Sequence, residues 1–87
     1  MNVFLYSLST SSWSRRTKTF LRKNKVPFDF VDYDLQSKAE KQKILEKMAN
    51  LGGGKSFPMV TIGDKVIIGY NPERIAQILD LKKEKQE

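Results

Sequence analysis

The sequence predicts an α/β domain of three layers, in which helices cover both faces of a four-stranded mixed sheet. A strand-like run at 2–7, a helical pattern at 12–24 and a strand-like run at 28–33 favour two parallel strands with a right-handed crossover. A second helical pattern, a two-residue hairpin centred on Gly63-Asp64 and a last helical pattern complete the order β-α-β-α-β-β-α.

The first helix follows a loop of small hydroxyl residues. Ser11 is a natural N-cap, because its side chain can accept a hydrogen bond from a free amide of the first turn. Asn24 and Pro27 are stop signals at its other end. Apolar residues recur at i, i+4, i+7 and i+8 and predict one apolar stripe: Trp13, Thr17, Phe20 and Leu21.

The second strand, at 28–33, precedes an expected loop at 34–36. Ser37 and Glu40 form a capping-box pattern that begins the second helix. Gly52 suits a left-handed C-cap at the helix end, since glycine adopts positive φ readily. The expected buried face of this helix comprises Ile44, Leu45, Met48 and Leu51.

The hairpin joins strands expected at 59–62 and 65–68. Gly63 precedes Asp64 in the two-residue loop, the order that a type II′ turn prefers. The last helix begins with Asn71 as its cap and Pro72 at its first position. Its expected buried stripe comprises Ile75, Ile78 and Leu79.

Length and composition limit the classes of function. The 87 residues predict one domain spanning 1–87, with 82–87 as a frayed C-terminal tail. The absence of Cys excludes disulfides, and the absence of both His and Cys excludes the common zinc and haem sites. No apolar run approaches the ~20 residues that span a bilayer. We therefore expect a cytoplasmic protein with no membrane partner and no metal.

The net charge of +6 is concentrated in one stretch. The chain between Ser11 and Phe28 contains no acid. A single Trp and no recognised nucleic-acid motif argue against binding to RNA or DNA. We expect this basic stretch to steer acidic partners toward the molecule. Its cations are Arg15, Arg16, Lys18, Arg22, Lys23 and Lys25.

Three segments together resemble the glutaredoxin family of the thioredoxin-like superfamily, over essentially residues 2–80. They follow the first strand, precede the third and follow the fourth, at Tyr6–Ser14, Phe57–Met59 and Gly69–Asn71. The resemblance implies a redox-active cysteine pair at positions 11 and 14. Both positions are serine here.

A thiol at position 11 would lie at the N-terminus of a helix, where free amides, the helix dipole and Arg15 favour a thiolate. A second thiol at position 14 would lie one turn further and could close a disulfide, while Trp13 would offer an apolar contact at the rim. Serine hydroxyls do not ionise near neutral pH, and the chain has no His to activate them. We therefore predict that this chain cannot exchange thiols and is catalytically inactive.

The resemblance implies further site residues. It places a cis peptide bond at Phe57-Pro58, whose exposed backbone could pair with an extended peptide or with glutathione. It also implies that the γ-glutamyl carboxylate of glutathione binds at the last helix, at Gly69, Tyr70 and Asn71. No bound cofactor is expected, and glutathione is the expected reductant or ligand.

Two departures from the family leave the reductant open. Leu8 stands where many glutaredoxins have Lys, and the turn reads Gly69-Tyr70-Asn71-Pro72 rather than Gly-Gly followed by acids. This turn is similar to that of glutaredoxin-like hydrogen donors recharged by thioredoxin reductase. The expected partners are disulfide-containing protein substrates with glutathione or a thioredoxin reductase.

Two hypotheses therefore remain. The first is a thiol-disulfide oxidoreductase that reduces protein or glutathione-mixed disulfides, present here in a Cys-to-Ser form. The alternative is a redox-inactive module that binds glutathione or a peptide. Serine at these two key positions favours deliberate replacement of both cysteines, and a natural relative that kept binding and lost catalysis is the other explanation.

Overall fold

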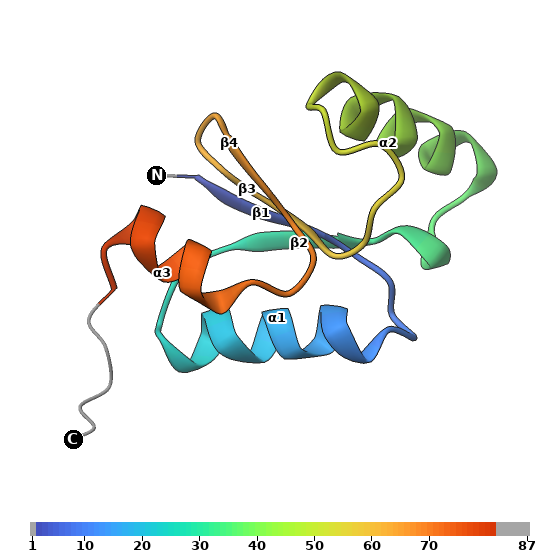
Figure 1. Cartoon of the computed structure of the whole chain (residues 1–87). Coiled ribbons are helices and arrows are strands. Elements are labelled where there is room, and N and C mark those ends of the chain that lie inside the picture. The colour runs from blue at the N-terminus through green and yellow to red at the C-terminus, as the bar shows by residue number, and fades with distance from the viewer. Residues whose placement is uncertain (1, 82–87) are drawn as a thin grey trace.

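The computed structural model describes residues 2–81, so the expected frayed tail at 82–87 lies outside the described residues. Regular elements follow one another in the predicted order (Figure 1). They are β1 (Val3–Ser7), α1 (Ser12–Lys23), β2 (Asp29–Asp32), a short 3₁₀ helix (Tyr33–Leu35), α2 (Lys38–Asn50), β3 (Met59–Ile62), β4 (Lys65–Ile68) and α3 (Pro72–Leu79).

The four strands form one mixed sheet in the order β2-β1-β3-β4. β1 pairs with β2 in parallel and with β3 antiparallel, and β4 pairs antiparallel with β3. α1 and α3 lie on one face of the sheet, and α2 lies on the other (Figure 1). The predicted three-layer α/β fold is confirmed.

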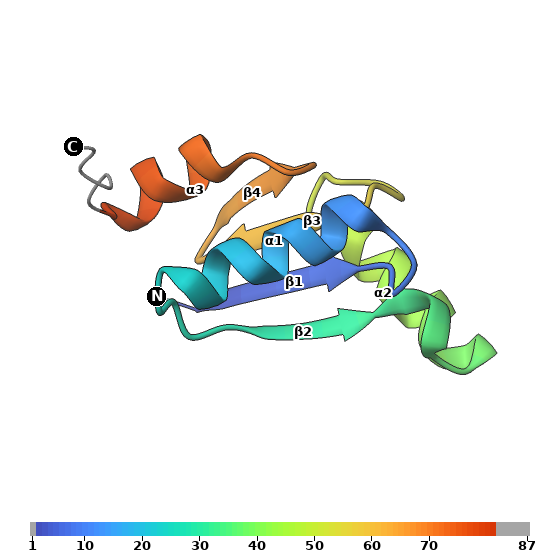
Figure 2. The same cartoon turned by 90° about the horizontal axis from the view of Figure 1, so that it is seen from below.

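The strand directions bring four loops to one end of the sheet. Tyr6 is paired with Met59, and Met59 with Ile68, so the end of β1, the start of β3 and the end of β4 are level. The parallel β2 ends at the same side. The segments 8–11 and 69–71 therefore lie near the start of β3, as both views show (Figures 1 and 2).

Side chains of β1 alternate between two apolar clusters, because successive residues of a strand point to opposite faces. Leu5 points to the face that α1 and α3 cover, and Tyr6 points to the α2 face. The cluster under α1 and α3 has the buried members Val3, Leu5, Leu21, Val26, Val60, Ile62, Ile67 and Ile75. The cluster under α2 has only the buried members Tyr6, Met48 and Met59.

The face of α1 that packs on the sheet shares Thr17 and Leu21 with the predicted stripe but has Ser14 in place of Trp13. Thr17 and Leu21 are buried as expected, and Phe20 is partly buried. Trp13, the first residue of the predicted stripe, is not buried, because 53% of its surface is exposed. Ser14 is buried in its place, since a small polar side chain fits against the backbone of the preceding loop.

Two other expectations need correction. The expected loop at 34–36 begins with a 3₁₀ helix (Tyr33–Leu35), closed by a hydrogen bond of 3.1 Å from the Gln36 N–H to the Tyr33 carbonyl. On α2 only Met48 is fully buried. Leu51 lies beyond the end of that helix and is 38% exposed, so it does not belong to the buried face.

The hairpin between β3 and β4 has the predicted bounds. Gly63 has φ +60°, and Asp64 does not share the positive φ, which fits a type II′ turn. Gly52 ends α2 with φ +93°, the left-handed conformation expected of a C-cap. Within residues 2–81 no helix is both long and apolar enough to cross a membrane.

Candidate functional site

The N-terminus of α1 lies at the end of the sheet where the loops meet. Ser11 is the N-cap, and its Oγ accepts a hydrogen bond of 3.2 Å from the Ser14 N–H. The Ser11 carbonyl accepts the Arg15 N–H at 3.1 Å and so begins the helix. Position 11 is therefore the point toward which the first free amides of α1 are directed.

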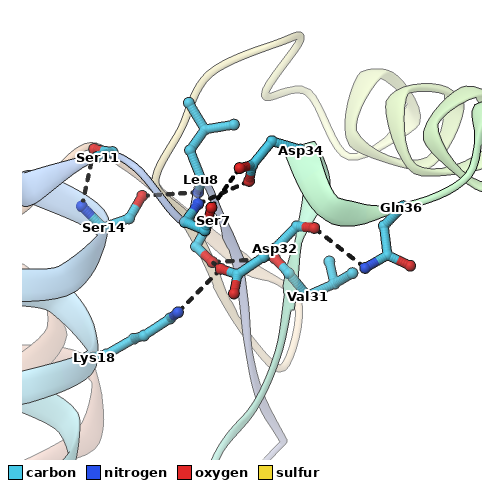
Figure 3. A network of polar contacts seen from close by, with 10 residues as sticks. Ser7, Leu8, Ser11, Ser14, Lys18, Val31, Asp32, Asp34 and Gln36 are labelled. Atoms are coloured by element: carbon cyan, nitrogen blue, oxygen red, sulfur yellow. Dashed lines mark hydrogen bonds and ion pairs between the residues drawn. The ribbon is translucent and has the colours of Figure 1, made fainter.

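Ser14 is buried one turn into the helix. Its Oγ accepts a hydrogen bond of 3.1 Å from the Leu8 N–H, and the Leu8 carbonyl accepts the Ser11 N–H at 3.1 Å. Ser11 and Ser14 thus join the loop to the helix through a short ring of hydrogen bonds (Figure 3). No carboxylate is hydrogen-bonded to either serine among residues 2–81, so neither has an activating base.

The segment before β3 is tied to the loop after β4. The Phe57-Pro58 peptide bond is cis, and the Pro58 carbonyl accepts the Gly69 N–H at 2.8 Å. Gly69 has φ +82°, a left-handed conformation that L side chains rarely adopt. This bond fixes the loop that leads into α3 beside the proline.

An aromatic contact joins α1 to the same loop. The rings of Trp13 and Tyr70 have their centroids 5.7 Å apart, and the Arg16 guanidinium lies 5.1 Å from the centre of the Trp13 ring. Trp13 remains half-exposed, so it presents an apolar surface at the rim. On the other side of the loops, the Phe57 ring is 5.1 Å from that of Tyr33.

Asn71 caps α3 by accepting the Arg74 N–H at 3.1 Å. Its exposed position leaves the N-terminus of this helix open to solvent. Arg15 is also exposed, in the first turn of α1. Arg15 forms no ion pair among residues 2–81.

An acid from the 3₁₀ helix holds the loop between β1 and α1 (Figure 3). Asp34 accepts the Ser9 N–H at 2.7 Å through one carboxylate oxygen and the Ser9 hydroxyl through the other. These two bonds, the hydroxyl first, lower the pKa of Asp34, and the Lys41 charge contributes weakly in the same direction.

A second acid lies behind the helix. Asp32 accepts hydrogen bonds from the buried Ser7 hydroxyl and from the Lys18 ammonium, the latter at 3.0 Å. The Lys18 ammonium also lies 4.2 Å from the centre of the Phe30 ring. Lys18 is therefore engaged on the inner side of α1 and is not part of its free basic surface.

Comparison with known proteins decides the family. A family model described as Glutaredoxin matches residues 3–67. The chain belongs to the glutaredoxin family. It is a redox family, and the fold described above is its thioredoxin-like fold, shared with the solved relatives.

Three relatives illustrate the similarity of this glutaredoxin-family chain. The methanoredoxin of Methanosarcina acetivorans is 30% identical with a TM-score of 0.85, over 90% of this chain and 83% of that one. A glutaredoxin of Archaeoglobus fulgidus is 35% identical with a TM-score of 0.84, over 90% and 85%. A glutaredoxin-like 8.6 kDa protein in the rubredoxin operon of Clostridium pasteurianum is 29% identical over 90% of this chain and 97% of its own length.

The residues singled out from the glutaredoxin resemblance all lie at the loop end of the sheet. The structure joins Ser11 to Ser14, Trp13 to Tyr70 and Pro58 to Gly69 by direct contacts. It gives no hydrogen bond between Arg15, in the first turn of α1, and Asn71, the N-cap of α3. The set therefore forms a rim of three linked pairs around the N-terminus of α1.

Sequence reasoning missed the two acids and their hydroxyl partners. A signal for them exists: Ser7 ends β1 and Ser9 follows it, whereas Asp32 ends β2 and Asp34 follows it. Carboxyl ends of neighbouring parallel strands meet at one edge of a sheet, so such hydroxyls and acids are brought together. No group of three or more His, Cys, Asp or Glu side chains within residues 2–81 could hold a metal ion.

Proposed function

We propose that this chain is a thiol-disulfide oxidoreductase scaffold in which Ser11 and Ser14 occupy the positions of a redox-active cysteine pair. The hydrogen bond of 3.2 Å from the Ser14 N–H to the Ser11 Oγ carries the proposal. It directs a backbone donor at the side-chain atom of position 11, which is the environment that stabilises a thiolate. Membership of the glutaredoxin family supports the same assignment.

With cysteines at both positions, the pair itself supplies the two electrons that reduce a substrate disulfide. The thiolate at position 11 attacks one sulfur of a substrate disulfide, and the other sulfur leaves as a thiolate that takes up a proton. The thiolate at position 14 then attacks the mixed disulfide and releases the second substrate sulfur. The substrate gains two electrons, and the pair becomes a disulfide that glutathione or a thioredoxin reductase must reduce.

With serine at both positions this reaction does not occur. The Ser11 hydroxyl serves as a helix cap, and the Ser14 hydroxyl accepts from the Leu8 amide. An alcohol forms no disulfide and, without a base, is a poor nucleophile. The chain as it stands therefore retains the binding surface of the scaffold and lacks its redox chemistry, whether the serines arose naturally or by design.

The proposed substrates are disulfide-containing proteins and glutathione-mixed disulfides. Among residues 2–81, the backbone of Phe57 makes no hydrogen bond to other backbone groups, so it is free to pair with an extended peptide. The N-terminus of α3, capped by Asn71, suits a carboxylate such as that of glutathione. Tyr70 and Trp13 would contact the apolar part of the ligand.

The outer face of α1 supports an acidic partner. Its four exposed cations make no ion pair among residues 2–81, whereas Lys18 is held by Asp32. Unpaired cations beside a site attract negatively charged surfaces and raise association rates, an effect that salt weakens. The exposed cations are Arg15, Arg16, Arg22 and Lys23.

Restoring the thiols tests the proposal. The double variant Ser11→Cys/Ser14→Cys should reduce a glutathione-mixed disulfide of a peptide when NADPH is supplied through glutathione and its reductase, or through thioredoxin reductase. Comparing the two sources identifies the reductant. The rate should fall as ionic strength rises, because the substrate and the reductant approach a basic surface.

A matched control is available two residues earlier. Ser9→Cys/Ser12→Cys has the same spacing, but position 9 faces the Asp34 carboxylate, which disfavours a thiolate. The unchanged chain and this control should both be inactive. Absence of turnover by the Ser11→Cys/Ser14→Cys variant with either reductant would reject the proposal.

A non-enzymatic binding module is the second candidate. The fixed contacts between Pro58 and Gly69 and between Trp13 and Tyr70 favour it, because they shape a rim that needs no thiol. An NMR titration of the unchanged chain with glutathione should shift amides at 11–14, Phe57 and Tyr70. If millimolar glutathione left these amides unmoved, the glutathione-binding module would be excluded.

A further inference from the structure

We propose that Asp34 is a positioning residue of the candidate site, whose carboxylate fixes the 8–11 loop and thereby presents position 11 to the N-terminus of α1. The effect of Asp34 on turnover rests on the proposed function, whereas its effect on the position of the loop can be measured in the unchanged chain. Asp34 touches neither Ser11 nor Ser14 and acts through Ser9.

The contact between Asp34 and Ser9 is specific. Both carboxylate oxygens bind the same residue, one at the Ser9 N–H and the other at its hydroxyl. The two residues are 25 positions apart: Ser9 lies in the loop after β1, and Asp34 lies in the 3₁₀ helix after the neighbouring parallel strand β2. A two-point bond to one residue fixes direction as well as distance, so Asp34 sets the path of the chain as it leaves β1.

Leu8, the neighbour of Ser9, connects the loop to the first turn of α1. Leu8, next to Ser9, donates its N–H to Ser14 Oγ and accepts the Ser11 N–H at its carbonyl, each at 3.1 Å. Release of Ser9 would free the stretch that connects Leu8 to Ser11. The cap of α1 would then lose its fixed entry direction, and the side chain at position 11 would lose its alignment with the Ser14 N–H.

The charges around Asp34 support its role as an ionised anchor. The Ser9 bonds lower its pKa below the ordinary value for Asp, and Lys41 of α2 acts in the same direction. Asp32, the nearest acid along the chain, is engaged by Ser7 and Lys18 instead. Since the pKa is lower in the folded state, the anchor is intact above the ordinary pKa of Asp and is lost as pH falls through the lowered value.

The first experiment uses the chain as it exists. Asp34→Ala should shift the backbone amide resonances of Ser9 and Ser11, whereas Asp29→Ala should leave both in place. Asp29 is an exposed acid of β2 that makes no side-chain hydrogen bond or ion pair among residues 2–81. Asp29→Ala therefore removes one negative charge, as Asp34→Ala does, without breaking a contact. If the two variants shift these amides equally, the positioning role is refuted.

A pH titration covers the case in which Asp34→Ala does not fold. In the unchanged chain, the Ser9 amide resonance should move with a midpoint below the ordinary pKa of Asp, because loss of the Asp34 charge weakens the bond. A Ser9 amide that does not respond in this range, while the chain stays folded, would contradict the proposal.

The second experiment adds Asp34→Ala to the Ser11→Cys/Ser14→Cys background. We expect at least about a tenfold fall in turnover, as misalignment of reacting groups costs rate. The pKa of the introduced thiol, measured from the pH profile of alkylation, should rise. Removal of a nearby negative charge alone would lower it, so an unchanged or lowered thiol pKa overturns the inference even where turnover falls.

The two experiments separate the claims. If the double-cysteine parent shows no activity, the proposed function fails, and the amide shifts of Ser9 and Ser11 still decide whether Asp34 fixes the loop. If the parent is active and Asp34→Ala moves neither the amides nor the thiol pKa, only the positioning role fails.

Discussion

At residue scale, the two serines have a structural role that a thiol fills less well. Ser11 Oγ caps α1 and Ser14 Oγ satisfies the Leu8 amide, and sulfur is a weak acceptor in both places. A thiol at position 11 would be reactive but would cap the helix less strongly than the hydroxyl does. The serine form of the scaffold is therefore expected to be the more stable one.

The cap can be measured directly. Ser11→Ala removes the acceptor of the Ser14 N–H and should lower the free energy of unfolding in urea by about 1 kcal/mol. Ser12→Ala is the matched control, because Ser12 is exposed, begins the helix and makes no side-chain hydrogen bond within residues 2–81. Equal losses in the two variants would show that the Ser11 hydroxyl does not stabilise the helix.

At the scale of elements, the sequence determined most boundaries through local chemistry. The bounds of β3 and β4 follow from the Gly63-Asp64 turn, and Ser11, Ser37 and Asn71 cap their helices as expected. These features depend on a few neighbouring residues, so a single sequence reveals them.

What the sequence did not reveal depends on tertiary packing. The 3.6-residue period allows Trp13 or Ser14 to face the sheet, and only the space beneath α1 selects Ser14. The hydrogen bond from Ser9 to Asp34 joins residues 25 positions apart and requires the parallel pairing of β1 and β2. The cap positions of the candidate site were thus predictable, whereas the residues that support its loop were not.

A glycine links α2 to the sheet. Gly53 is buried, and its N–H donates to the Met48 carbonyl at 3.0 Å. A Cβ at position 53 would lie 2.0 Å from the sulfur of Met59, a fully buried residue, so one of the two would have to shift. Gly53→Ala should therefore lower the free energy of unfolding by about 1–3 kcal/mol, as overpacking does.

The clash has a specific partner, which a double-mutant cycle can test. Met59→Ala removes the atom that the new methyl group would meet, so Gly53→Ala should cost clearly less in that background. Urea unfolding of the four proteins gives the coupling energy. If Gly53→Ala lowers the free energy of unfolding equally with Met and with Ala at position 59, the loss arises from the backbone at position 53 and not from the clash.

At the scale of the whole molecule, the two faces of the sheet are unequally stabilised. The face under α1 and α3 has eight buried apolar residues, whereas the α2 face has three. A groove of about 250 Å³ remains between α2 and the sheet, lined in part by Phe4, Tyr6, Val31 and Ile44. Since burial of apolar area drives folding, α2 should be the least firmly attached of the long helices.

Hydrogen exchange should show this difference residue by residue. The free energy of a local opening grows with the apolar surface that the opening exposes, so the central amides of α2 should exchange through openings smaller than global unfolding. Amides of β1 and α1 should exchange only on global unfolding. Met48 is the one fully buried side chain of α2, so Met48→Ala should remove most remaining protection from that helix.

Leu21→Ala provides the comparison on the other face, because Leu21 is equally buried in the larger cluster. It should lower the free energy of global unfolding by about 2–5 kcal/mol, so the amides of β1 and α1 lose protection, whereas α2 amides that exchange through local opening keep theirs. Equal protection of α2 and α1 in the unchanged chain would refute this difference between the two faces.

The candidate site depends on β1 and α1 for its serines, so local opening of α2 should leave the N-terminus of α1 in place. Asp34 lies between β2 and α2, and its bonds to Ser9 are the contact of the site that such an opening would reach first.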